Sequence, residues 1–212
     1  MLEILYFDEL DSTQKYLIDL IKKEKICKKV AVVTKKQTNG IGSRGNSWNS
    51  KEGDLLFSFA ISKDELPEDL PIQSTSIYFG FLIKEILKEY DNRCWLKWPN
   101  DIYIEDKKCG GVITQILKNC VIIGIGINLT PKDESVTYIE LENAHNKILF
   151  PYFLLLKNLP KWKLIFSKFR VEFKKNLAFS THYQGEELEL QNAILCDDGS
   201  LLINNERIYS LR

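Results

Sequence analysis

Hydrophobic and polar positions in the first ninety residues follow two different periods. Bulky residues dominate the start of the chain, and two further apolar runs have the length of buried strands. After the first run, apolar residues recur at helical spacing behind Asp11, Ser12 and Thr13, which are residue types that cap helices. The pattern predicts strands over 2–7, 30–34 and 55–61, a helix that follows the cap residues, and a longer helix over 73–90.

The pattern changes to short strands and turns in the middle of the chain, and then to helices. The short strands are predicted over 94–98, 102–105, 112–117 and 121–128, as an antiparallel meander. Helices are predicted over 151–159 and 160–177, with Pro160 at the first helical position. From Tyr183 the residues alternate with the period of a strand, which predicts small hairpins. We expect an α+β domain over 1–180, with a mixed or antiparallel sheet flanked by helices, and a small β unit over 181–212.

Composition and charge exclude several classes of protein. The 212 residues include 44% hydrophobic residues, and 29 Lys and Arg balance 29 Asp and Glu, so a disordered chain is excluded. A net charge of zero argues against a dedicated DNA-binding protein. No apolar run is long enough to span a membrane, and the first residues lack the basic start of a secretory signal. We therefore expect a cytoplasmic protein.

The cysteines do not suggest a disulfide framework or a metal site. There are five of them, with no Cys-x-x-Cys pair. We expect buried, reduced thiols, because these are more common than catalytic cysteines.

A glycine-rich stretch over 37–53 holds the first candidate site. It contains four of the eleven glycines, and glycines let backbone N–H groups approach a ligand closely. Arg44 offers donors suited to phosphate or carboxylate, and Trp48 offers a flat apolar wall. A basic run leads into the stretch, which makes an anionic partner more credible. A solvent-exposed loop with glycine turns remains the alternative.

Three later segments carry further candidates, each with a plain structural alternative. Lys97 precedes a rigid Trp-Pro-Asn-Asp turn, and Lys108 precedes two glycines, but either could be a surface lysine. Gly124 and Gly126 leave one face of a strand without side chains, so either a packed helix or a flat ligand should lie on it. Asn128 points to the same bare side. The Asp-Ser-Thr-Gln start of the first helix could be a cap, a ligand site or both.

Taken together and in order, these segments resemble biotin–protein ligases of the monofunctional type. The matching segments are Ser12-Thr13-Gln14, Gln37, Gly40–Trp48, Lys97–Asp101, Lys108–Val112 and Gly124–Asn128. The resemblance implies a class II aminoacyl-tRNA synthetase/biotin synthetase-like fold with an SH3-like C-terminal domain. It also implies that biotin and ATP, with Mg²⁺, form biotinyl-5′-AMP, from which biotin passes to a lysine of a carrier protein. With the first strand starting near residue 2, we expect no DNA-binding domain.

The resemblance assigns roles residue by residue. Lys108 would neutralise the biotin carboxylate and the phosphate charge, with Lys97 and Arg44 as further catalytic cations. Two anions must be held together in this reaction, so cations and N–H donors dominate its requirement. The biotin site would comprise Ser12, Thr13, Gln14, Gln37, Ile41, Gly42, Ser43, Lys108 and Gly111. The ATP site would comprise Arg44, Trp48, Lys97, Asn100, Asp101, Lys108 and Asn128, with Asp101 as the metal candidate.

One departure concerns the glycine loop. The family usually has three arginines there, which help to hold the phosphate, whereas this chain has Ile41, Ser43 and Asn46 at those positions. We expect weaker retention of the adenylate, or compensation by Lys35 or Lys36.

The expected partner is the biotin carboxyl-carrier domain of acetyl-CoA carboxylase or of a related carboxylase, with no DNA and no membrane. The sequence does not decide between a monomer and a homodimer. Two other functions are kept as alternatives. One is a lipoate–protein ligase or octanoyltransferase, and the other is a non-catalytic biotin- or nucleotide-binding module.

Overall fold

A seven-stranded mixed sheet forms the centre of the protein. The computed structural model describes residues 2–24, 27 and 29–209. The strand order is β1-β2-β5-β9-β8-β7-β6, in which β1 and β2 are parallel and the other neighbours are antiparallel. The last four strands of the chain in this sheet therefore form the predicted meander. The strands are β1 (Glu3–Leu10), β2 (Val30–Gln37), β5 (Leu55–Ser62), β6 (Cys94–Lys97), β7 (Asp101–Ile104), β8 (Lys107–Leu117) and β9 (Cys120–Ile127).

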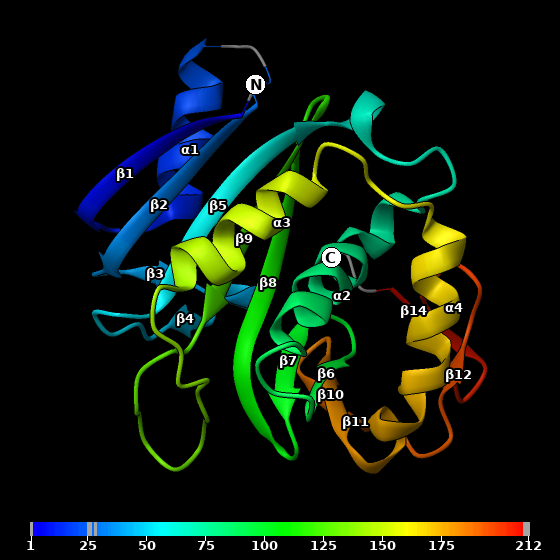
Figure 1. Cartoon of the computed structure of the whole chain (residues 1–212). Helices are drawn as coiled ribbons and strands as arrows, with labels where there is room; N and C mark the ends of the chain where they lie inside the picture. Colours follow the sequence, from blue (N-terminus) through cyan, green and yellow to red (C-terminus); the bar gives the residue numbers. More distant parts are fainter. Residues whose placement is uncertain (1, 25–26, 28, 210–212) are drawn as a thin grey trace.

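Helices cover both faces of the sheet (Figure 1). The first helix, α1, packs on one face, where Leu17 and Ile21 meet Val32 and Ile122. The remaining helices lie on the other face, over the larger part of the core. Their bounds are α1 (Thr13–Glu24), α2 (Thr75–Leu87), α3 (Phe150–Leu155) and α4 (Trp162–Glu172). Short 3₁₀ helices are η2 (Lys63–Glu65), η3 (Ile72–Ser74) and η5 (Phe173–Ala178), and η4 (His145–Leu149) is a π-helical turn that leads into α3.

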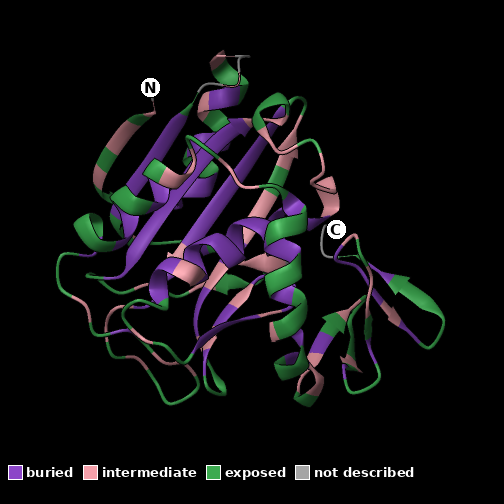
Figure 2. Cartoon of the chain, turned by 45° about the vertical axis from the view of Figure 1, so that its right-hand side comes forward, coloured by how far each residue is buried: buried purple, intermediate pink, exposed green. Residues whose placement is uncertain are grey.

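Burial follows the predicted periods. Strands β5 and β9 are buried along nearly their whole length, as their continuous apolar runs predict (Figure 2). Helix α2 is buried on almost every side, because it lies between the sheet and the later helices. None of the helices in the described part of the chain is long and apolar enough to cross a membrane.

The C-terminal strands form two small sheets that pack on the α2–α4 side. They are β10 (Ser180–Tyr183) with β11 (Glu186–Glu189), and β12 (Ile194–Leu195) with β13 (Leu201–Ile203) and β14 (Glu206–Ile208). Leu190, Leu201 and Ile208 belong to the same apolar cluster as the main domain. The small unit therefore shares its core with the rest of the chain. The predicted boundary between residues 180 and 181 falls inside β10.

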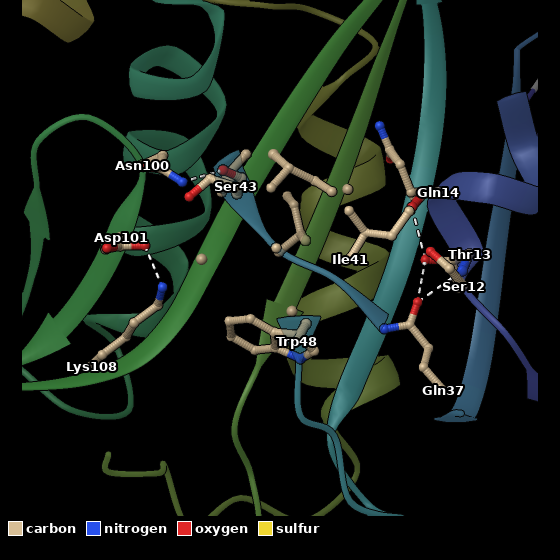
Figure 3. Close-up of a pocket in the computed structure, with 18 residues that line it drawn as sticks. Ser12, Thr13, Gln14, Gln37, Ile41, Ser43, Trp48, Asn100, Asp101 and Lys108 are labelled. Atoms are coloured by element: carbon tan, nitrogen blue, oxygen red, sulfur yellow. Dashed lines mark hydrogen bonds and ion pairs between the residues drawn. The ribbon is translucent and has the colours of Figure 1, made fainter. Parts of the chain in front are cut away.

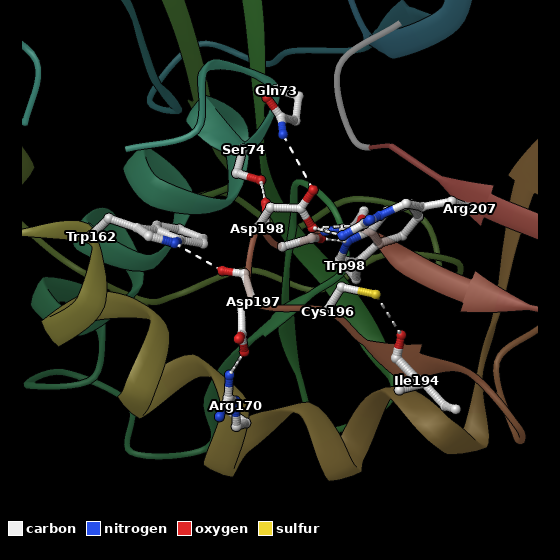
Figure 4. A network of polar contacts seen from close by, with 12 residues as sticks. Gln73, Ser74, Trp98, Trp162, Arg170, Ile194, Cys196, Asp197, Asp198 and Arg207 are labelled. Atoms are coloured by element: carbon white, nitrogen blue, oxygen red, sulfur yellow. Dashed lines mark hydrogen bonds and ion pairs between the residues drawn. The ribbon is translucent and has the colours of Figure 1, made fainter. Parts of the chain in front are cut away.

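A turn at Asp197 and Asp198 fastens this unit to the main domain (Figure 4). Trp162 donates its indole N–H to the Asp197 carbonyl at 3.1 Å, and Trp98 donates to the Gly199 carbonyl at 2.9 Å. Ser74 donates to the Asp198 carbonyl. The buried indole N–H groups thus satisfy the carbonyls of a turn that would otherwise be poorly paired.

Two expectations about local structure are wrong. Cys27 and Cys120 form a disulfide, because Cys27, between α1 and β2, lies beside the start of β9 with the two Cα atoms 5.4 Å apart. The other three cysteines are free. Pro160 is not at the first helical position, since α4 begins at Trp162 and the carbonyl of Pro160 instead accepts the Tyr78 hydroxyl at 2.6 Å.

Candidate functional site

The candidate site is a cavity on the α1 side of the sheet, enclosed by the N-terminus of α1, the glycine-rich stretch and the strands β5, β7, β8 and β9 (Figure 3). The empty space between its walls, including the part that is open to solvent, is about 420 Å³. The described residues that line it are Ser12, Thr13, Gln14, Gln37, Ile41, Gly42, Ser43, Trp48, Ser58, Asn100, Asp101, Lys108, Gly111, Val112, Ile113, Gly124, Ile125 and Gly126. All nine residues predicted for the biotin site therefore line one cavity, whose walls come from six separate segments of the chain.

One end of the cavity is neutral and hydrogen-bonded. The backbone N–H of Thr13 donates to Gln37 Oε1 at 2.8 Å, and the Thr13 and Ser58 hydroxyls lie 2.8 Å apart. Ser12 is 2% exposed, and its hydroxyl accepts the Lys15 N–H at 3.4 Å. Ser12 therefore both caps the start of α1 and lines the cavity. This end offers hydroxyl and amide groups whose positions are fixed by one another.

Gln14 has a buried polar atom that lacks a partner. Its amide nitrogen donates to the Ile122 carbonyl at 3.3 Å, while its Oε1 is buried and makes no hydrogen bond. A buried acceptor without a donor is costly, and such an atom facing a cavity is suited to a ligand N–H.

The other end of the cavity is charged. Lys108, near the start of β8, places Nζ 2.6 Å from Asp101 Oδ1. Both side chains are partly exposed, at 31% and 21%, and both line the cavity. An ammonium in this position can neutralise an anion that enters the cavity, with Asp101 holding it until then.

The bare strand face lies between the two ends. A Cβ atom on Gly126 would lie 2.6 Å from the Trp48 ring, and one on Gly124 would lie 2.7 Å from Gln14 Oε1. The opposite residues, Ile123 and Ile125, pack in the core. The glycines are therefore required by close side chains, since Gln14 of helix α1 lies on Gly124 and the Trp48 ring lies on Gly126.

The glycine-rich stretch is more ordered than a plain loop. It forms the hairpin β3 (Gly40–Ile41) with β4 (Ser47–Trp48), around the short turn η1 (Ser43–Gly45). The Gly42 N–H donates to the Asn46 carbonyl at 2.7 Å, which closes the turn. The hairpin places Ile41 and Trp48 across the middle of the cavity (Figure 3).

Two predicted residues do not line the cavity. Lys97 Nζ lies 3.3 Å from the Tyr103 hydroxyl and over the rings of Tyr103 and Phe179. Burial, with a smaller effect of the Asp101 charge, raises the pKa of Tyr103 to about 12, so this hydroxyl stays protonated at neutral pH. The amide of Asn128 is used by Lys132 and by the Thr137 carbonyl.

The remaining predicted cations differ in what the structure says of them. The side chain of Arg44 lies outside the described part of the protein, so its predicted role stays a prediction. Lys35 and Lys36 pair with Asp8 and Glu9 on exposed parts of β1 and β2, and neither lines the cavity. The expected compensation by these two lysines therefore has no support.

The turn after Trp98 is tied to β8. The Asn100 side chain donates to the Val112 carbonyl at 2.8 Å, and the Val112 N–H donates back to the Asn100 carbonyl at 2.8 Å. This pair of bonds fixes the turn, so that the next residue, Asp101, faces Lys108. Asn100 thus has a structural task within the site.

Sequence reasoning missed Ser58, Asp54 and Lys132. Ser58 is fully buried in β5 and bonds Thr13. Its signal was a single hydroxyl inside an otherwise apolar run, a position where a polar side chain needs a partner. Asp54 and Lys132 form a buried ion pair at 2.9 Å, which no short-range pattern would show.

Cys94 and Cys109, two of the free cysteines, are buried inside the sheet. A hydrogen bond with Cys94, together with burial, raises the pKa of the Cys109 thiol well above its usual value. This agrees with the expectation that these two cysteines are structural.

Comparison with known proteins places this geometry in a family. Residues 6–128 match the Biotin/lipoate A/B protein ligase family. The chain belongs to this family. A solved biotin acetyl coenzyme A carboxylase synthetase from Helicobacter pylori, with bound biotinylated ATP, is 36% identical, with a TM-score of 0.92 over 99% of this chain and 100% of that chain.

Two further family members extend the comparison. The biotin protein ligase from Aquifex aeolicus, in complex with biotin and ATP, is 25% identical, with a TM-score of 0.74 over 99% of this chain and 96% of that chain. The bifunctional ligase/repressor BirA of Bacillus subtilis is 33% identical over 131 residues, which are 59% of this chain and 40% of the relative. The chain thus matches less than half the length of that curated relative. The family fold, a mixed sheet flanked by helices with small C-terminal strands, is confirmed.

Proposed function

We propose that this protein attaches biotin to a lysine of a carboxylase carrier domain in an ATP-dependent reaction. The observation that carries the proposal is the cavity itself, which has fixed neutral hydrogen-bonding groups at one end and the Lys108 ammonium at the other. Biotin has the same division, with a polar ureido ring at one end and a carboxylate at the other. The similarity to the structure with bound biotinylated ATP supports it.

The reaction proceeds in two steps. A biotin carboxylate oxygen attacks the α-phosphorus of ATP, which forms biotinyl-5′-AMP and releases pyrophosphate. The amine of the carrier lysine then attacks the acyl carbonyl, loses a proton and expels AMP. Carboxylate and phosphate repel each other, so the protein contributes mainly by holding them together and neutralising their charge.

The neutral end is assigned to the ureido ring. Thr13, Ser58 and Gln37 offer hydroxyl and amide groups, and the unpaired Gln14 Oε1 suits a ureido N–H. The predicted contacts of Ser12 and of the 41–43 backbone also belong here, since these residues line the same cavity.

The charged end is assigned to the acid and the phosphate. Lys108 exchanges the Asp101 carboxylate for the entering anions, and Trp48, beside it, bounds the nucleotide. The predicted roles of Arg44, Asn100 and Asn128 in ATP binding stay predictions, whereas for Lys97, which lies outside the cavity at Tyr103, we expect no such role.

Mg²⁺ is proposed to enter with the phosphates of ATP. Among the described residues that line the cavity, Asp101 is the one carboxylate, and no cluster of metal-binding side chains occurs in the described part of the chain. This donor set fits Mg²⁺, because Mg²⁺ at nucleotide sites keeps several waters and takes one or two protein carboxylates.

The alternative of a lipoate ligase is less well supported. The dithiolane ring of lipoate has no hydrogen-bond donors, so it would leave the Gln14 acceptor unpaired. The deciding experiment mixes the protein with ATP, a biotin carboxyl-carrier domain and labelled biotin or lipoate. We expect label transfer from biotin alone. Transfer from lipoate, or binding without any transfer, would contradict the proposal.

A further inference from the structure

Lys132 is a buried lysine that the proposed reaction does not use. Its side chain is 8% exposed and lies in the connection after β9. Its ammonium contacts Asp54 Oδ2 at 2.9 Å, Asn128 Oδ1 at 2.6 Å and the Asn49 carbonyl at 2.6 Å. An ammonium has three donors, and these three contacts use all of them.

The partner carboxylate, Asp54, is equally saturated. Its side chain is fully buried. One oxygen accepts the Leu129 N–H at 3.0 Å and the Thr130 hydroxyl at 2.9 Å, while the other accepts the Lys51 N–H at 2.8 Å and Lys132. Groups this deeply buried hold their geometry strongly, because losing one partner leaves a charge unpaired.

The network joins three segments that surround the cavity. Asn49 and Lys51 follow the hairpin that carries Trp48, Asp54 precedes β5, and Asn128 ends β9. The same connection continues to Thr137, whose N–H donates to the Lys108 carbonyl at 2.9 Å. The lysine is thus bonded at the point where the hairpin returns to the sheet.

Trp48 is the side chain that this arrangement controls. Its ring lies on the bare backbone of Gly126, with Lys132 Nζ 5.6 Å and Lys108 Nζ 5.5 Å from the ring. The indole N–H is buried and has no hydrogen-bond partner. Packing and two neighbouring ammonium groups hold the indole, so its position depends on how firmly the hairpin is fastened.

We propose that Lys132 is a positioning residue, which fastens the end of the Trp48 hairpin to β5 and β9 and so keeps the hairpin closed over the activated acid. This inference rests on the proposed function. The glycine-rich loop of this chain has few arginines, and Lys35 and Lys36 pair with acids away from it. Lys132 is a cation that does act on the hairpin. Lys132 acts through the hairpin, whereas Lys108 is the cation assigned to the substrates.

Lys84 provides a matched control. Its side chain is 1% exposed, and its Nζ lies 2.8 Å from Glu85 Oε1 and 2.9 Å from Glu172 Oε2. It lies in α2 and does not line the cavity. Lys84→Met therefore removes a similar buried ion pair without touching the hairpin.

The experiment follows pyrophosphate release with ATP and biotin in the absence of a carrier domain. The initial burst measures adenylate formation, and the slower steady rate measures adenylate escape. For Lys132→Met we expect a burst rate within threefold of the wild type and a steady rate at least tenfold faster. For Lys84→Met we expect both rates within threefold of the wild type.

A double variant separates positioning from stability. Lys132→Met with Asp54→Asn removes both buried charges, so no charge is left unpaired and the melting temperature should recover. The steady rate should stay at least tenfold above the wild type, because the fastening is still missing. If Lys132→Met does not fold stably enough to assay, the steady rate of the double variant tests the inference in its place.

Two results overturn the inference. One is a double variant that regains wild-type adenylate retention together with its melting temperature. The other is the same acceleration in Lys84→Met. A wild type that releases no pyrophosphate at all with biotin and ATP would instead reject the proposed function, and this inference with it.

Discussion

The two ends of the cavity are built differently. At the neutral end, Thr13, Gln37 and Ser58 are hydrogen-bonded to one another. At the charged end, Lys108 and Asp101 form an ion pair that is partly open to solvent. The neutral groups are held by neighbours in three elements, whereas the charged pair can exchange partners when an anion arrives.

This difference separates recognition from chemistry. Fixed neutral groups select a ring by shape and hydrogen bonding, and they have the same partners before and after the reaction. An exchangeable ammonium contributes most where charge accumulates during the reaction. We therefore expect changes at the neutral end to affect mainly the affinity for biotin, and changes at the charged end to affect mainly the rate.

The largest effect should come from Lys108→Met. Loss of the ammonium leaves the carboxylate and phosphate charges unneutralised, which should slow adenylate formation by roughly 10²–10³-fold. Rapid-quench measurement of biotinyl-adenylate, with biotin and ATP saturating, gives this rate. The expected change in biotin affinity is much smaller.

Lys108→Arg is the control for this prediction, because it keeps a positive charge at this position. Its rate should fall far less than that of Lys108→Met. A wild-type rate in Lys108→Met would remove the electrostatic basis of the proposed mechanism.

The two bare glycines of β9 allow a sharper comparison, because each faces one end. Gly126→Ala would push the Trp48 ring, while Gly124→Ala would push the Gln14 carbonyl. Overpacking of this kind costs about 1–3 kcal/mol, or roughly a 5- to 150-fold loss. We expect the loss in kcat/KM for ATP with Gly126→Ala, and in kcat/KM for biotin with Gly124→Ala.

Steady-state kinetics with each substrate varied in turn would measure both changes. Equal losses for both substrates in both variants would show that the two ends do not act separately.

The elements with a regular period were predictable from sequence, and the contacts between distant segments were not. Strands β5 and β9 and the bare face at Gly124 follow from continuous or alternating apolar residues. The two-residue strands β3 and β4 are too short to show a period. The disulfide of Cys27 with Cys120 spans 93 positions, and no local signal specifies it.

The candidate site shows the same limit. Residues in motifs, such as Thr13 and Lys108, were found because their neighbours are distinctive. Lys132 follows a proline in a polar connection, and nothing near it in the sequence marks it. Only the fold brings it into contact with Asp54, which lies 78 positions earlier. Lys97 stands in the most distinctive motif and pairs with Asp101 on the same face of the sheet, yet it lies outside the cavity, because β6 is the edge strand and the Lys97 ammonium lies at the Tyr103 hydroxyl.

A smaller effect is expected for Thr13→Val, at the neutral end. The change keeps the shape of the side chain but removes the hydroxyl that bonds Ser58 and Gln37. An unpaired buried polar group costs about 1–3 kcal/mol, part of which the free protein already bears, so biotin affinity should fall roughly tenfold. Isothermal titration with biotin measures this affinity, and the rate at saturating biotin should change little. A large loss of rate with unchanged affinity would reverse the roles given to the two ends.

The smallest effect is expected for Lys97→Met. Because the ammonium of Lys97 lies beside the Tyr103 hydroxyl and over aromatic rings outside the cavity, its removal should change kcat/KM for adenylate formation by less than threefold. Tyr103→Phe is the matched variant, since it removes the hydroxyl and keeps the ring under Lys97. A loss near that of Lys108→Met would mean that Lys97 reaches the substrates, and the charged end would then contain two cations, from the strands β6 and β8 on either side of β7.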